Sequence, residues 1–286
     1  MNRFFLLLGL ALLTSCLQKV DLEVEQIPHQ LVVNCFFTEG EAFRVHVSRL
    51  AAYTDLSDRN IPNARVTISA NGKSLGTLTY LEKGVYRNPA ILPQPGKLYQ
   101  LTVEVEGYPK ATAQDSLPHP VFIDSVTYTP KAGKYDDGLD YNQFSVWFRD
   151  IPGKTWYSIV IIPYDIFSSD PVIAAEGMTG EDFVSWFAFS DTLFSNQFYG
   201  LKINVGDYYR DVDNCKILLT SGTYHYYQYL KRLLKHDSYS WEDPFKPYYP
   251  VPLYSNVKDG LGVFAGFRCR PYNLDISNPD SDESSR

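Results

Sequence analysis

The sequence lacks the residue patterns on which most catalytic and cofactor sites depend. It contains no Cys-x-x-Cys and no His-x-x-x-His pair, which are common zinc-binding patterns. It also contains no Gly-x-Ser-x-Gly elbow for a serine nucleophile, and no complete Gly-x-Gly-x-x-Gly or Walker pattern for a nucleotide. We therefore expect no catalytic residues, no metal ion and no cofactor, and we do not expect an enzyme.

Positive charge is also scarce. Lys and Arg number 26 against 33 Asp and Glu, so the formal net charge is −7. No cluster of basic residues reverses this balance locally, which argues against a nucleic-acid partner. Two groups of aspartates lack EF-hand spacing, and we interpret them as solvated loops rather than calcium sites: Asp136, Asp137 and Asp140, and then Asp207, Asp211 and Asp213.

Cysteines are few as well, and one of the four, Cys16, lies close to the N-terminus. At most one disulfide can form among Cys35, Cys215 and Cys269, and their spacing neither requires a disulfide nor selects a pair. Cys35 and Cys215 lie in or beside compact apolar runs, so we expect both to be buried.

Aromatic and turn-forming residues are abundant. Hydrophobic residues make up 44% and charged residues 21% of the chain, which is typical of a folded protein. The aromatic content is 15%, with 18 Gly and 18 Pro. This composition favours strands and turns over a helix bundle.

Residues 28–117 have the pattern of an Ig-like β-sandwich module. The apolar run Leu31–Phe37 is followed by alternating segments at Phe43–Ser48, Ala64–Ile68 and Tyr99–Val105. Asn71-Gly72 is a strong signal for a hairpin turn. Short strands at this spacing, without a helix between them, predict a sandwich that folds without the rest of the chain.

Two prolines within Leu117–Pro120 mark a boundary, and a second β-rich module is predicted over residues 118–274. A polar loop is expected between residues 131 and 142, and a final strand at Gly260–Phe267. One amphipathic helix is predicted near residues 221–236, with Ser221 as its N-cap. The chain is thus predicted to be mainly β, with two β-sandwich-like modules and a disordered tail at residues 275–286.

The N-terminus has the pattern of a lipoprotein signal peptide. Arg3 precedes the short apolar run Phe4–Leu13, which ends in Leu13-Thr14-Ser15-Cys16. This ending resembles the bacterial lipobox, so residues 1–15 are predicted to be a signal peptide, Cys16 the lipidated residue, and residues 16–27 a tether. Two or three acyl chains would anchor the protein to a membrane stably. The alternative is an ordinary secretory signal with a chance cysteine.

Three features together carry a family resemblance: the lipobox, the turn and strand at Ile61-Pro62-Asn63-Ala64-Arg65-Val66, and the segment Ser255–Gly266. With them the chain resembles the Bacteroidota lipoprotein family catalogued as domain of unknown function 4249. Similar pieces are Leu31–Asn34 and Gly96–Leu101. The resemblance supplies no catalytic residues that could be assigned to this chain. We interpret Gly260, Gly262 and Gly266 as structural residues that allow positive φ or a close approach of the backbone.

The resemblance implies an outer-membrane lipoprotein that is often encoded beside a TonB-dependent outer-membrane receptor. We therefore expect a lipid-anchored protein, facing either the cell surface or the periplasm, that serves as a non-catalytic binding accessory to such a receptor in nutrient uptake. The alternative is a structural or adhesive cell-envelope lipoprotein without a transport partner.

One aromatic segment is the candidate for contact with a partner. Its prolines limit the conformations available before binding, and its rings are of the types favoured at interfaces. The alternative is that these rings cover the end of the sandwich and pack on the helix. The candidate residues are Tyr239, Trp241, Phe245, Tyr248, Tyr249 and Tyr254.

Overall fold

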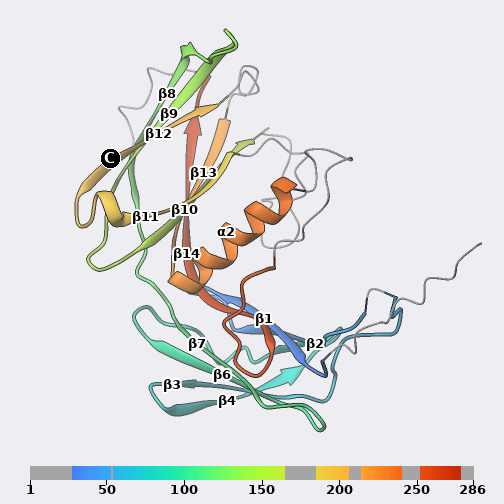
Figure 1. Cartoon of the computed structure of the whole chain (residues 1–286). Coiled ribbons are helices and arrows are strands. Elements are labelled where there is room, and N and C mark those ends of the chain that lie inside the picture. The colour runs from blue at the N-terminus through green and yellow to red at the C-terminus, as the bar shows by residue number, and fades with distance from the viewer. Residues whose placement is uncertain (1–27, 53, 165–184, 206–213, 240–251, 278–286) are drawn as a thin grey trace, which may run out of the picture.

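A computed structural model describes residues 28–52, 54–164, 185–205, 214–239 and 252–277 of the protein (Figure 1). The protein is mainly β, with one mixed sheet of 11 strands, a second sheet of three strands and, within the described ranges, a single α-helix. No helix among these residues is both long and apolar enough to cross a bilayer. The predicted fold class is confirmed.

The first half of the chain forms strands wherever apolar and polar residues alternate. In β1 the residues Leu31, Val33, Cys35 and Phe37 are buried and those between them are half-buried. The predicted hairpin at Asn71-Gly72 is confirmed, since both residues have positive φ, 49° and 78°. The strands are β1 Leu31–Phe37, β2 Arg44–Arg49, β3 Arg65–Ala70, β4 Lys73–Tyr80, β5 Val85–Arg87, β6 Leu98–Glu104 and β7 Ala111–Ser116.

The second half contains longer strands and a short 3-10 helix, η1. Its three-stranded sheet has the order β12-β9-β8, and the strands β11, β10, β13 and β14 extend the large sheet. The elements are β8 Ile123–Lys134, β9 Asp140–Arg149, β10 Trp156–Tyr164, β11 Ser185–Ser190, η1 Asp191–Leu193, β12 Phe198–Val205, β13 Asn214–Gly222 and β14 Leu261–Asp275.

The polar loop predicted at residues 131–142 is mostly strand. β8 and β9 continue to Lys134 and Asp140, whose side chains form an ion pair of 2.9 Å. The remaining turn is closed by a 2.8 Å hydrogen bond from the Tyr135 N–H to the Leu139 carbonyl. Asp137 accepts a hydrogen bond from the Leu139 N–H at 3.1 Å, so this aspartate group stabilises a turn. The second group, Asp207, Asp211 and Asp213, lies outside the described residues.

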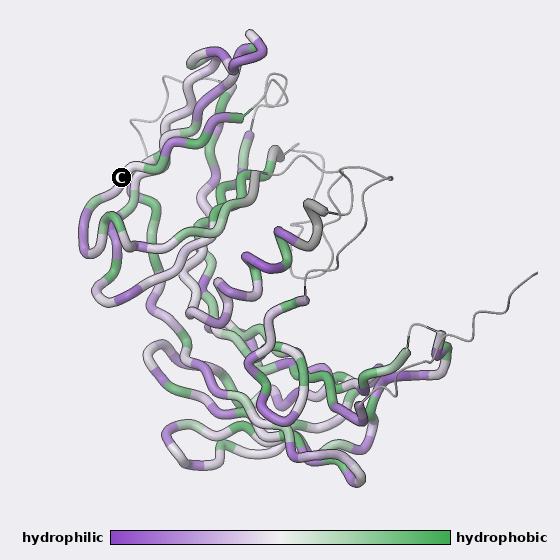
Figure 2. Tube along the Cα trace, viewed as in Figure 1, coloured by the Kyte–Doolittle hydropathy of each residue, from purple (hydrophilic) through white to green (hydrophobic). Residues whose placement is uncertain are grey.

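The predicted helix is present as α2, Tyr224–Tyr239, and begins three residues later than expected. Hydrophilic and hydrophobic residues alternate along it in Figure 2, and it packs across β14, β10, β11 and β13. Ser221 is not the N-cap: it belongs to β13, and its hydroxyl donates to the His119 carbonyl at 2.6 Å. Thr223 is the cap, because its Oγ1 accepts a hydrogen bond from the Tyr226 N–H at 3.3 Å.

β14 connects the two halves of the protein (Figure 1). Its first part pairs parallel with β1, from Val32↔Leu261 to Phe37↔Gly266, and its second part pairs antiparallel with β13. The buried hydrophobic residues form two cores. The first contains residues up to Leu117 together with Val257 and Phe264 from near the C-terminus, and the second begins at Val121. The module boundary near Leu117–Pro120 stays a prediction; the structure adds that the first core draws on the C-terminal strand.

Two glycines allow this arrangement. Gly262 has a φ of 113°, and a Cβ there would lie 2.1 Å from the Val33 carbonyl oxygen. A Cβ on Gly266 would lie 2.1 Å from the Ser116 carbonyl oxygen. The structural interpretation of these glycines is therefore confirmed, and β14 is longer than the predicted Gly260–Phe267 because its second part has β13 as a partner.

The three described cysteines are free thiols. Cys35 and Cys215 are buried as predicted, and burial raises the pKa of each to about 12. Cys269 is half-buried, and burial raises its pKa as well. Reactive cysteines have lowered rather than raised pKa values, so these residues behave as small apolar side chains.

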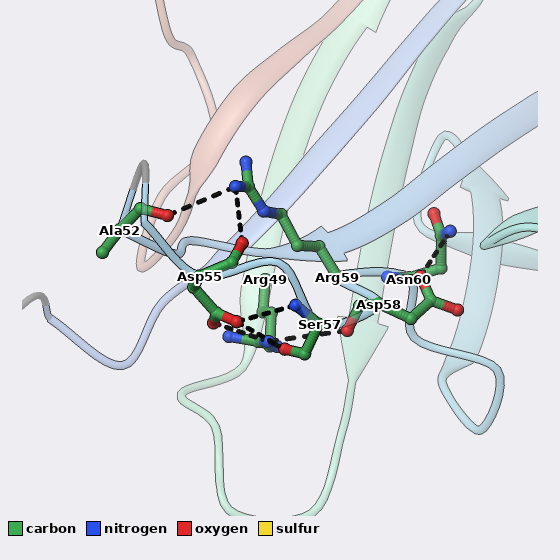
Figure 3. Close-up of polar contacts among 7 residues, drawn as sticks. All are labelled: Arg49, Ala52, Asp55, Ser57, Asp58, Arg59 and Asn60. Carbon is green, nitrogen blue, oxygen red and sulfur yellow. Dashed lines mark hydrogen bonds and ion pairs between the residues drawn. The ribbon is translucent and has the colours of Figure 1, made fainter.

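The polar loop after β2 is held by its own side chains (Figure 3). Asp55 accepts hydrogen bonds from the Ser57 hydroxyl and N–H at 2.6 and 2.9 Å, and forms a 2.9 Å ion pair with Arg49. These contacts, those from Ser57 first, hold the pKa of Asp55 well below its usual range. Arg59 donates to the carbonyls of Ala52 and Asp55 at 3.2 and 3.0 Å. These polar groups are occupied within the loop, which makes the loop a structural feature.

Candidate functional site

The structure describes only part of the predicted site. Tyr254 is described, and Tyr239 is the last residue of α2, with its side chain outside the described part. The remaining candidates also lie outside the described residues, as does the predicted lipidation site: Trp241, Phe245, Tyr248, Tyr249 and Cys16.

Tyr254 belongs to a group of rings at the start of α2, which we call the helix-start cluster: Trp156, Tyr224, His225 and Tyr254. Trp156 and Tyr224 meet edge to face, with ring centroids 5.4 Å apart. Tyr254 stacks on His225 at 5.9 Å, and its hydroxyl lies 2.7 Å from the His225 Nδ1. The cluster therefore combines three segments that are distant in sequence. They are the start of β10, the first residues of α2 and the segment that leads to β14.

Hydrogen bonds fix the segment that carries Tyr254. The Asn256 side chain accepts from the Phe264 N–H and donates to the Phe264 carbonyl, each at 2.9 Å. Farther back along the segment, Arg232 of α2 donates to the Pro252 carbonyl at 3.2 Å. Paired backbone groups of this kind hold a loop in one conformation, so Tyr254 is presented on a fixed support.

A buried carboxylate lies beside the cluster. Asp115, on the inward face of β7, accepts hydrogen bonds from the Thr223 hydroxyl and from the Gly266 N–H, the latter at 2.9 Å. Burial raises the pKa of Asp115, while the bond from Thr223 acts in the opposite direction. A negative charge at the N-terminus of α2 is favoured by the helix dipole. Asp115 thus ties the last strand of the first half to α2 and to β14.

The cluster has the chemistry of a protein-binding surface. Tyr224 is 46% exposed, and the exposed Leu253 adjoins Tyr254 in the chain. The ammonium group of Lys154 lies 5.5 Å from the centroid of the Trp156 ring. Burial raises the pKa of Tyr254, so its hydroxyl remains a neutral hydrogen-bonding group at physiological pH. Trp and Tyr with a polar edge are the residue types that dominate binding energy at interfaces.

The residues predicted to contact a partner include Tyr254 but not its three neighbours in the cluster. Tyr224 and His225 fall within the predicted helix, and no local pattern places them or Trp156 beside residue 254. The density of tyrosines at the start of the helix is the one signal in the sequence that could have pointed to this surface.

Metal binding has no support in the described part of the chain, where no three His, Cys, Asp or Glu side chains gather as a metal site would require. His29 stacks on Tyr108 with centroids 4.0 Å apart, and His46 lies 3.0 Å from the Asn60 side-chain oxygen. These histidines contribute to packing and to loop structure.

Comparison with known proteins provides the family. No curated protein matches the chain. A family model described as "Domain of unknown function (DUF4249)" matches residues 18–270, a range that includes the first core, most of the second core, α2 and the helix-start cluster. Since the match covers most of the chain, the protein belongs to the DUF4249 family.

Proposed function

We propose that this protein is an outer-membrane lipoprotein that acts as a non-catalytic binding accessory to a TonB-dependent receptor in nutrient uptake. The lipobox-like ending Leu13-Thr14-Ser15-Cys16 supports the anchor. The family resemblance, with its frequent receptor neighbour, supports the partner.

The helix-start cluster is the main structural support for the proposed binding role. Its rings come from three segments and rest on a hydrogen-bonded support, so little conformational freedom is lost when a partner docks. Tyr254 is also the last candidate residue of the predicted aromatic segment. We infer that the cluster contacts the receptor through Tyr224 and Tyr254.

Copurification tests the receptor-binding role. The full-length protein is extracted from its native membrane with mild detergent, and a retained TonB-dependent receptor is identified by mass spectrometry. Tyr224→Ala should weaken receptor binding by about 30-fold, the equivalent of about 2 kcal/mol, and so lower the amount of receptor retained. Absence of such a receptor from the wild-type preparation would favour a structural envelope role instead.

Tyr135→Ala is the matched control. Tyr135 is 40% exposed and contacts Tyr141 with centroids 5.1 Å apart, as Tyr224 contacts Trp156, but it lies at the tip of the β8–β9 hairpin. Retention should be unchanged in this variant. Equal losses for both tyrosines would argue against a specific surface. Trp241→Ala, in the same assay, tests the predicted aromatic segment.

Fractionation tests the anchor separately. Cys16→Ala should release the protein from membranes or leave its precursor uncleaved, because the acyl chains attach to the Cys16 thiol. A variant that still carries lipid by mass spectrometry and remains with the membrane would refute the assignment of Cys16. Wild-type protein treated in parallel is the reference.

A further inference from the structure

The outer face of the three-stranded sheet differs chemically from the rest of the protein. The inner face of β9 contributes Phe144, Val146 and Phe148 to the second core, so the alternate residues face outward. Strand pairing places the following residues side by side on the outer face: Ser125, Thr127 and Thr129 of β8, Gln143, Ser145, Trp147 and Arg149 of β9, and Phe198, Gly200, Lys202 and Asn204 of β12.

Trp147 lies flat on this face. A Cβ built on Gly200, the residue paired with Trp147, would lie 2.4 to 2.6 Å from three consecutive atoms of the six-membered indole ring. A Cβ equally close to three ring atoms meets the face of a ring and not its edge. One face of the indole therefore covers the Gly200 backbone, and the other is directed away from the sheet.

Phe198 adds a second ring beside Trp147. Its ring is 49% exposed and stacks nearly parallel to the Trp147 ring, with an angle of 12° between the two planes and centroids 5.6 Å apart. The Arg149 guanidinium lies 5.8 Å from the Phe198 centroid. Trp147 alone is sufficient to cover the backbone of Gly200. The exposed ring of Phe198 is not needed for that purpose. We call the two rings together the aromatic platform.

Polar groups continue from the platform along the same strands. The Gln143 amide donates to the Asn204 amide oxygen at 2.8 Å, which fixes both side chains on the outer face. Gln143 and Trp147 are four residue steps apart on β9, a distance of about 14 Å along the strand. A ligand that follows the strands would meet aromatic rings first and amides second.

This face carries more positive than negative charge, although the chain has a net charge of −7. The paired outward positions contain Arg149 and Lys202 and no Asp or Glu, and the exposed Asp124 lies at the register shift between Ile123 and Ser125. The face therefore combines stacking rings, hydrogen-bonding amides and hydroxyls, and excess positive charge.

We propose that the outer face of β8, β9 and β12 binds an oligosaccharide that contains uronic acid residues. The apolar C–H face of a pyranose ring stacks on the Trp147–Phe198 platform, its hydroxyls bond to the amides of Gln143 and Asn204, and its carboxylates pair with Arg149 and Lys202. This inference goes beyond the proposed function and needs no receptor.

Calorimetry with two soluble probes tests the proposal on the purified full-length protein. The probes are hexasaccharides of β-1,4-linked glucuronic acid and of β-1,4-linked glucose, which share their ring stereochemistry and differ in the carboxylate. The glucuronate probe should bind more tightly, and added salt should reduce this preference. Trp147→Ala should weaken binding of both probes about ten-fold, the scale of one lost stacking contact.

Further variants separate stacking from charge. Arg149→Gln and Lys202→Gln should weaken binding of the glucuronate probe and leave the glucose probe unchanged. Phe198→Ala replaces Trp147→Ala if the latter loses its near-ultraviolet circular dichroism. Phe187→Ala is the control for Phe198→Ala, since the Phe187 side chain is 45% exposed but lies on β11. Binding of neither probe, equal affinity for both, or full affinity in folded Trp147→Ala and Phe198→Ala proteins would overturn the proposal.

Discussion

Phe264→Ala tests whether the C-terminal strand completes the first core. Phe264 is fully buried on β14, and its ring lies against Phe37 with centroids 4.7 Å apart and against Phe43 at 6.2 Å. Truncation removes these contacts and leaves a cavity, because the neighbouring rings belong to paired strands and can move little. The expected loss is about 3–5 kcal/mol, a large share of the roughly 5–15 kcal/mol that stabilises an ordinary domain.

Urea unfolding followed by far-ultraviolet circular dichroism measures this loss, and hydrogen exchange locates it. Phe144→Ala is the matched control, since Phe144 is equally buried but lies in the second core. Phe264→Ala should accelerate exchange in β1–β7, although residue 264 lies far from them in sequence. A loss below about 1 kcal/mol, or faster exchange only in β8–β13, would refute the assignment of Phe264 to the first core.

Three further predictions follow from the same contacts. A chain ending at Ser116 lacks Phe264 and should show no cooperative urea transition, whereas a sharp transition would support the predicted independent first module. Gly262→Ala should cost about 1–3 kcal/mol in urea unfolding, while Gly107→Ala, also at positive φ but with open space where its Cβ would lie, should cost less. Burial raises the pKa of folded Asp115, so wild-type stability relative to Asp115→Asn should be greatest at low pH, where Asp115 is protonated in both the folded and the unfolded state, should fall as pH rises through the folded pKa, and should be constant above it; a pH-independent difference would contradict this.

The sequence predicted strands well where one face is buried and the other is not. Leu31–Phe37 has the same bounds in the structure as in the sequence interpretation, since its apolar residues mark the strand directly. The same reasoning failed between residues 131 and 142, where β8 and β9 project as a hairpin with both faces largely polar. Polarity there reflects exposure on both sides, and cross-strand contacts such as Tyr141 over Gly133 support the strands.

Strand partners were beyond the reach of local patterns. The alternation of β1 shows which side chains face the core, but the parallel pairing of β1 with β14 joins residues more than 200 positions apart. For the same reason Tyr254 could be proposed as a contact residue while Trp156 and Tyr224 could not. The platform of Trp147 and Phe198 likewise depends on the register that sets Gly200 opposite Trp147.

The helix-start cluster lies where the two halves meet, and this position links binding to the arrangement of the halves. Asp115 belongs to the first half, whereas Thr223 and Gly266 belong to the cap of α2 and to β14. A partner that contacts Tyr224 and Tyr254 therefore rests on elements already joined by these hydrogen bonds. Loosening the junction would raise the conformational cost of docking even if every contacting ring were intact. We therefore assign the Asp115 carboxylate the role of a positioning group, which holds the elements of the proposed binding surface together and does not itself contact the proposed partner.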